Sequence, residues 1–104
     1  MYEVDIEVPE HWNDKVIMKA VEAACKYLGL TQRSRLYWVK RFVRWQIKME
    51  KQKGSIEITY LPRTRRAWCA VRKNRYADWI DSAIPQLKLD IERRLTDPRS
   101  EVRG

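Results

Sequence analysis

The chain begins with a strict alternation of apolar and acidic positions that predicts a half-buried β-strand. Over residues 2–8 every second residue is apolar, and Glu3, Asp5 and Glu7 stand between them. A period of two places the apolar residues on one face of a strand and the acids on the other. Pro9 ends the strand, because proline cannot donate to a strand ladder.

Residues 13–28 carry apolar positions at helical spacing and predict an amphipathic helix. Asn13 is suited to cap its first turn, and Gly29 stands where a glycine commonly ends a helix.

Residues 31–52 predict a second helix, capped by Thr31 or Ser34 and stopped by Gly54. On a helical wheel at about 100° per residue the bulky apolar residues fall on one broad arc. Cations fall on the other side, with Tyr37 among them. This basic ridge comprises Arg33, Lys40, Arg41, Arg44, Lys48 and Lys51. No acid interrupts the ridge, although an ordinary solvated helix face mixes both signs.

Two strands, 55–61 and 66–72, are predicted around the turn Pro62-Arg63-Thr64-Arg65. A loop of this length pairs Leu61 with Arg66, and this register gives both strands one apolar face. The residues of that face are Ile56, Ile58, Tyr60, Ala67, Cys69 and Val71.

Residues 75–95 carry a further helical stripe, for which Asn74 is the expected cap. Pro85 lies inside it, so we expect a kink, or a break with Pro85 in the first turn of a second segment. Residues 96–104 are polar and are expected to form a flexible tail.

These elements follow the order β-α-α-β-β-α within a single domain over residues 1–95. The order predicts a two-layer α+β fold. In it, three helices pack on a small antiparallel or mixed sheet made of the N-terminal strand and the hairpin. A length of 104 residues fits one domain of this kind.

Charge adds a functional indication, because it is concentrated in the middle of the chain. Residues 31–75 hold 14 of the 22 Lys and Arg residues and only two acids, Glu50 and Glu57, so this block carries +12. The first 30 residues carry −3 and the last 29 carry −1, which gives the total of +8. Such a block repels itself unless a polyanion meets it. The sequence therefore favours nucleic acid, DNA or RNA, as the partner.

We expect the basic ridge to contact phosphates, with Arg63, Arg65 and Arg66 of the hairpin turn extending the contact. Tyr37 or Trp68 could stack on unpaired bases. Alternatively, the ridge could pair with the acidic face of the first strand or serve solubility alone. Trp68 could also pack under a neighbouring element, and the turn arginines could discourage edge pairing.

No catalytic motif is present, and we expect a non-catalytic protein without metal or cofactor. His11 is the single histidine and stands in an expected loop. Glu3, Asp5, Glu7 and Glu57 could in principle gather a metal ion for phosphodiester hydrolysis. Acids on strands are, however, more often the cross-strand partners of cations.

The remaining signals concern location and rival partners. Cys25 and Cys69 form no CxxC pair, so reduced thiols and a cytoplasmic location are expected. No apolar run reaches the roughly 18 residues of a membrane-spanning helix, so we expect no membrane partner. The alternative to nucleic acid is a protein-interaction module, or an accessory or inhibitor subunit, that docks an acidic protein with Trp45 as an anchor. A homodimer through an edge strand or the helix over 31–52 stays open.

Overall fold

The computed structural model describes residues 2–9, 12–38 and 42–96, which form five strands, two α-helices and one short 3-10 helix. In chain order the elements are β1 (Tyr2–Ile6), α1 (Asp14–Tyr27), β2 (Thr31–Trp38), β3 (Phe42–Lys48), β4 (Ile56–Leu61), β5 (Arg66–Val71), η1 (Lys73–Arg75) and α2 (Asp78–Thr96). His11 and residues 97–104 of the predicted tail lie outside the described residues.

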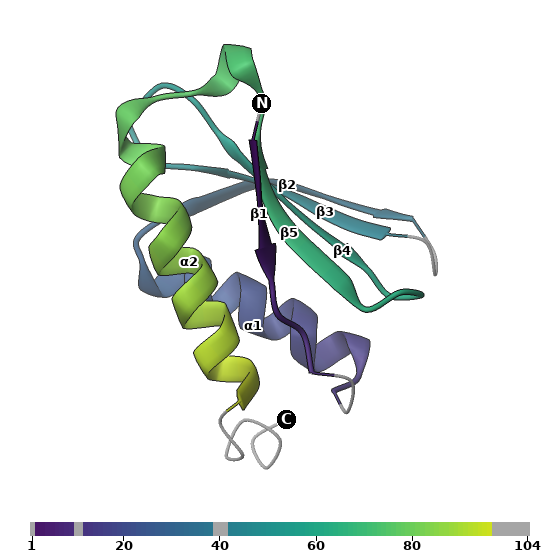
Figure 1. Cartoon of the computed structure of the whole chain (residues 1–104). Helices are drawn as coiled ribbons and strands as arrows, with labels where there is room; N and C mark the ends of the chain where they lie inside the picture. The colour runs from purple at the N-terminus through teal and green to yellow at the C-terminus, as the bar shows by residue number, and fades with distance from the viewer. Residues whose placement is uncertain (1, 10–11, 39–41, 97–104) are drawn as a thin grey trace.

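All the strands join in one antiparallel sheet with the order β1-β5-β4-β3-β2. Both helices pack on the same side of this sheet (Figure 1). The protein is therefore α+β, with the element order β-α-β-β-β-β-α. The predicted architecture, three helices on a small sheet in the order β-α-α-β-β-α, is wrong.

The error lies in residues 31–52, which form β2 and β3 instead of a helix. Along β3, Val43, Trp45 and Ile47 are fully buried, and the residues between them are partly exposed. Aromatic and β-branched side chains at a period of two favour a strand. On a helical wheel such an alternation spreads around the axis, which explains why the apolar arc was so broad.

The predicted hairpin over residues 55–72 is confirmed as β4 and β5. Leu61 pairs with Arg66, and Ile58 pairs with Cys69 on the buried face. Strand β1 adds to β5 with Val4 opposite Cys69. The apolar faces of three strands are therefore continuous beneath the helices.

Helix α1 begins and ends where the sequence predicts. Asn13 Oδ1 accepts a hydrogen bond from the backbone N–H of Val16 (2.9 Å) and caps the first turn. After the last turn Gly29 adopts φ +72°, a left-handed conformation that favours glycine. The buried stripe of α1, with Ile17 and Val21, packs against the sheet.

Helix α2 starts later than predicted and continues through Pro85. Asn74 lies in η1 and does not cap α2, which begins at Asp78. Proline leaves the carbonyl of Asp81 without its helical donor. Both residues are exposed, so water can satisfy that carbonyl and the helix does not break.

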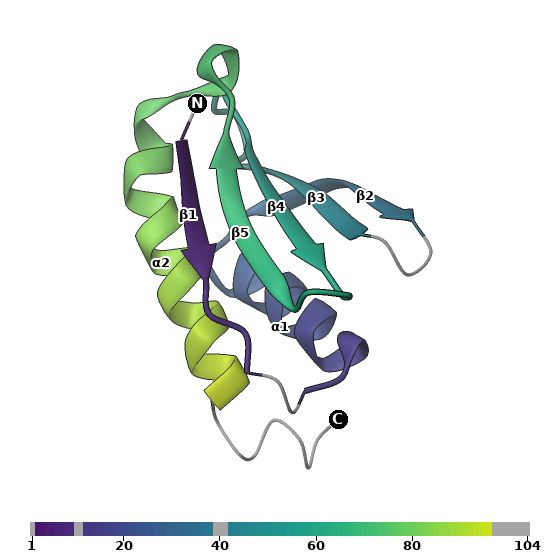
Figure 2. The ribbon, with the colours of Figure 1, turned by 45° about the vertical axis from the view of Figure 1, so that its right-hand side comes forward.

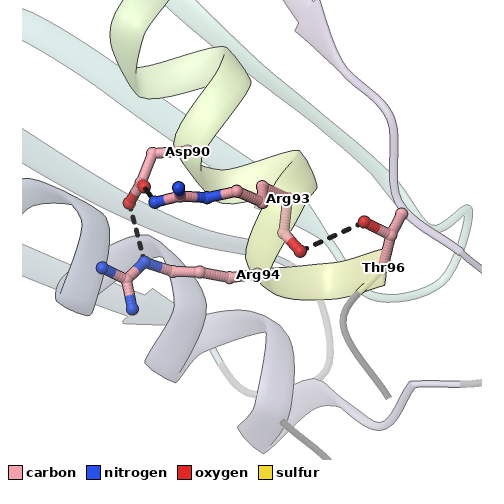
Figure 3. Close-up of polar contacts among 4 residues, drawn as sticks. All are labelled: Asp90, Arg93, Arg94 and Thr96. Carbon is pink, nitrogen blue, oxygen red and sulfur yellow. Dashed lines mark hydrogen bonds and ion pairs between the residues drawn. The ribbon is translucent and has the colours of Figure 1, made fainter. Parts of the chain in front are cut away.

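The last turns of α2 are held by a buried carboxylate (Figure 3). The side chain of Asp90 is 6% exposed and forms ion pairs with Arg93 and Arg94. The Arg94 guanidinium also lies 5.7 Å from the ring centroid of Tyr27, at the end of α1. Asp90 therefore orients an arginine that joins the two helices.

Helix α2 also occupies the outer edge of β1. Lys88 Nζ donates to the carbonyl of Asp5 (2.8 Å), and Glu92 accepts the backbone N–H of Glu7 (2.7 Å). An exposed strand edge presents such groups to other chains. Helix α2 satisfies one carbonyl of β1 and the N–H of Glu7 just after the strand, so this end of the edge is less open to pairing with another chain.

Candidate functional site

The charge segregation along the sequence becomes a segregation between the two layers. The basic block over residues 31–75 forms β2 to β5 and η1. The net charges of the two helices cancel: α1 has three cations and two acids, whereas α2 has three cations and four acids. The excess positive charge of the described chain therefore belongs to the sheet layer.

We call the sheet face turned away from the helices the open face, since no helix of the described chain covers it (Figure 2). The strand register places Arg44, Thr59, Trp68 and Asp5 side by side across this face. Arg44 Nε donates to Thr59 Oγ1 (3.1 Å). Thr59 is only 1% exposed even on this uncovered face, which indicates that larger neighbouring side chains shield it.

Two arginines of the open face stack on aromatic rings. The guanidinium carbon of Arg66 lies 4.8 Å from the ring centroid of Trp68, and that of Arg44 lies 5.1 Å from the ring centroid of Phe42. Both distances are within the roughly 6 Å reach of a cation–π contact. Trp68 is half-buried on the open face and so does not pack under a helix.

The acid beside Arg66 is exposed. Arg66 Nη2 lies 3.4 Å from Asp5 Oδ1, and both side chains are more than half exposed. An ion pair of this kind contributes about 0–1 kcal/mol. It orients Arg66 without removing its charge from an incoming ligand.

One end of the open face contains a polar pocket of about 180 Å³, which we call the arginine pocket. Its lining residues are Arg44, Gln46, Ser55, Glu57, Arg72 and Arg75. Glu57 lies between two of the arginines, 3.0 Å from Arg72 Nε and 3.9 Å from Arg44 Nε. One carboxylate among three guanidiniums leaves a formal excess of two positive charges.

The structure does not form the predicted basic ridge, because the ridge depended on a helix. Arg44 and Lys48 lie four positions apart on β3, so their side chains are on the same face, the open face. Lys40 and Arg41 fall between β2 and β3, outside the described residues. The predicted phosphate contacts on one helix face are therefore replaced by cations spread over a sheet.

The other members of the predicted site are dispersed. Arg33 lies at the register shift between Gln32 and Ser34 in β2. Lys51 lies in the turn after β3 with φ 64°. Tyr37, a predicted stacking residue, pairs with Val43 in the β2–β3 ladder.

The hairpin turn divides its arginines between two roles. Arg63 is exposed at the turn, and Arg66 lies on the open face. Arg65 has φ 58° and donates to the carbonyl of Trp12, so it ties the turn to the loop before α1. Of the three arginines predicted to contact phosphate, Arg63 and Arg66 have exposed side chains.

The predicted site residues do not include the following members of this surface: Phe42, Gln46, Ser55, Arg72 and Arg75. The alternation over residues 42–48 was the signal that would have placed Phe42 and Gln46 beside Arg44. The pocket required a further step. The predicted hairpin already returns the segment after β5 to the start of β4, but only the pairing of β3 with β4 brings Arg44 and Gln46 to the same place.

The described residues contain two buried thiols and no metal-binding cluster. Among them no group of three His, Cys, Asp or Glu residues could hold a metal ion. Burial raises the pKa of Cys25 and Cys69 to about 12, so both thiols are protonated at neutral pH and are weak nucleophiles. No α-helix in the described ranges is long and apolar enough to cross a membrane.

Comparison of the chain with protein-family models, with curated proteins and with solved structures found no match. Its own residues are therefore the basis for any functional inference.

Proposed function

We propose that this protein binds single-stranded nucleic acid, without catalysis, across the open face of its sheet. The observation that carries the proposal is the pairing of arginines with aromatic rings on a face that no described helix covers. Arg66 lies over Trp68 and Arg44 lies over Phe42. Each pair consists of residues two positions apart on one strand, β5 for Arg66 and Trp68 and β3 for Phe42 and Arg44, and β4 lies between these strands. Cations suited to contact phosphates and rings suited to stack on a base therefore alternate on one face.

Single strands fit this surface better than duplexes. A base stacks on an aromatic side chain only when it is unpaired and free of its own neighbours. Arg44, Arg66 and Lys48 would neutralise phosphates along the strand, and each contact releases counterions. Trp68 and Phe42 supply the rings. Binding of this kind tolerates any base sequence, because every base has a π-face that can stack on a ring.

Glu57 and Asp5 do not argue against an anionic ligand. Each touches arginines of the open face and restricts their rotamers. Arginines held in this way lose less conformational entropy on binding. A phosphate that approaches them replaces part of a weak surface ion pair by a charge-assisted hydrogen bond.

The test is fluorescence anisotropy with labelled single-stranded and duplex DNA and RNA at low and near-physiological salt. We expect single strands to bind more tightly than duplexes, with a logarithmic affinity that falls linearly with the logarithm of salt concentration. Absence of binding at low salt would overturn the proposal. A preference for duplexes would overturn the stacking mechanism.

A matched pair of charge reversals tests the surface. Arg66→Glu on the open face should lower affinity and reduce the salt slope by at least about 1. Lys19→Glu makes the same charge change on the exposed side of α1 and should alter affinity far less. Equal effects of the two variants would show that only net charge matters.

The rival function is docking of an acidic protein, and the aromatic anchor expected for it, Trp45, is not exposed to a partner. Trp45 is fully buried, and its indole N–H donates to Glu22 in α1. A protein partner becomes the next hypothesis if no nucleic acid binds at low salt.

A further inference from the structure

The arginine pocket lies at the end of the open face where β3 ends, β4 begins and the chain leaves β5 for η1. Its walls come from three separate segments: Arg44 and Gln46 from β3, Ser55 and Glu57 around the start of β4, and Arg72 and Arg75 around η1. We propose that this pocket binds the terminal phosphate monoester of a nucleic-acid strand. This inference rests on the proposed function and names the part of the strand that the pocket recognises.

Charge favours a monoester over an internal phosphodiester. Three guanidiniums and the Glu57 carboxylate leave a formal charge of +2 in the pocket. A phosphate monoester carries about −1.5 to −2 at neutral pH and offers three terminal oxygens. An internal diester carries a single negative charge and fewer free oxygens, so it leaves part of the pocket charge uncompensated.

Existing contacts pre-orient the pocket rather than fill it. Glu57 forms an ion pair with Arg72 Nε at 3.0 Å. Arg44 Nε donates a hydrogen bond to the Thr59 hydroxyl at 3.1 Å. These contacts use the Nε side of each guanidinium, so its terminal nitrogens keep donors for a ligand. The Arg75 guanidinium has no side-chain partner among the described residues, although the pocket includes it.

Size favours one phosphate-sized group. A volume of about 180 Å³ is below the roughly 300–1,000 Å³ of pockets that enclose a whole drug-sized ligand. A terminal phosphate enters such a space, whereas the sugar and base stay outside. The rest of the nucleic-acid strand would then continue along the open face towards Trp68 on β5.

The experiment compares one single-stranded oligonucleotide in three forms, with a 5′-phosphate, with a 3′-phosphate and with hydroxyl groups at both ends. Its fluorescent label is placed internally. We expect one of the phosphorylated forms to bind about tenfold more tightly than the hydroxyl form, a difference of the size given by one or two charge-assisted hydrogen bonds. Equal affinity of all forms would overturn this inference and leave the proposed function intact.

Matched variants locate the effect in the pocket. Arg75→Ala should abolish the preference for the phosphorylated end, while Lys73→Ala, which removes an exposed charge two residues away and outside the pocket, should keep it. Arg75→Lys should retain part of the preference. A preference that survives Arg75→Ala would show that the terminal phosphate binds elsewhere.

The two proposals fail in different ways. If no form of the oligonucleotide binds at low salt, the proposed function and this inference are both wrong. If all forms bind equally and Arg66→Glu weakens each of them, the open face binds strands and the pocket does not read their ends.

Discussion

The indole N–H of the fully buried Trp45 donates to Glu22 Oε2 across the interface between β3 and α1, at 2.9 Å. The same carboxylate oxygen accepts Arg35 Nη1 from β2 at 2.8 Å. One partly exposed acid in the helix layer therefore satisfies a core donor and an edge-strand cation together.

Glu22→Ala should lower the free energy of unfolding by about 1–3 kcal/mol, because it leaves the Trp45 N–H without its acceptor in the interior. Glu22→Gln keeps a carbonyl acceptor and loses only the ion pair with Arg35, so its cost should be below about 1 kcal/mol. Urea unfolding followed by tryptophan fluorescence measures both values. Arg35→Ala reports the ion pair alone, and an effect as large as that of Glu22→Ala would contradict the role given to Trp45.

Local signals predicted the elements whose pattern fits a single period. The capped helix after Asn13 and the hairpin register of Leu61 with Arg66 appear in the structure. The alternation over residues 2–8 appears as β1, which ends at Ile6, before the predicted end at Pro9. The predicted helix over residues 31–52 was wrong, because the spacing of the cations also fitted one face of a helix. The burial of every second residue in β3 depends on β4 beside it and α1 beneath it, which are long-range partners that no local window contains.

Trp68→Leu should weaken binding of single strands by about 1–3 kcal/mol for each base that stacks on it. The salt slope should stay unchanged, because no cation is removed. Anisotropy titrations at several salt concentrations separate the two quantities. Tyr27→Leu removes an aromatic side chain that is 68% exposed on the helix layer, and it should leave affinity unchanged. Loss of salt slope in Trp68→Leu would indicate that the ring acts only by holding Arg66.

The two buried thiols predict a loss of stability at alkaline pH. Burial raises the pKa of Cys25 and Cys69 from an ordinary value near 9 to about 12. The folded state therefore keeps protons that the unfolded state releases above pH 9, so the free energy of unfolding falls as pH rises from about 9 to 12. Below that window the thiols give no pH dependence.

Urea unfolding at pH 8 and pH 10 tests this prediction. The decrease should be smaller in the double variant Cys25→Ala, Cys69→Ala than in the native chain. It should not vanish, because burial and the hydrogen bond to Asp14 also raise the pKa of Tyr60. Neither thiol should react with Ellman's reagent under native conditions at pH 8, whereas both should react in urea. Fast native reaction of either would contradict its burial.

The candidate site was predictable only in its chemistry. Charge counting predicted an anionic partner and singled out Arg44 and Arg66, and the hairpin register predicted Trp68 beside them; the three residues do share the open face. The arginine pocket could not be read from spacing. Arg44 and Arg75 are 31 positions apart, and they approach each other because the antiparallel order β5-β4-β3 returns the chain to the same end of the sheet.

Gly54 is the residue that lets η1 approach the start of β4. Gly54 has φ +89°, and a Cβ there would lie 2.6 Å from the carbonyl oxygen of Arg75. That carbonyl also accepts the N–H of Ser55 at 2.9 Å, so any displacement disturbs two walls of the arginine pocket. Gly29 offers a matched control, since it has φ +72° and nothing within 4 Å of a Cβ.

Gly29→Ala should cost about 1–2 kcal/mol, the price of a left-handed conformation for an L-residue. Gly54→Ala should cost more, because backbone atoms must also separate. It should in addition lose the preference for a phosphorylated strand end, which Gly29→Ala retains. Thermal unfolding and the oligonucleotide comparison measure the two effects. If Gly54→Ala costs no more than Gly29→Ala, the close approach of η1 to β4 does not constrain the pocket.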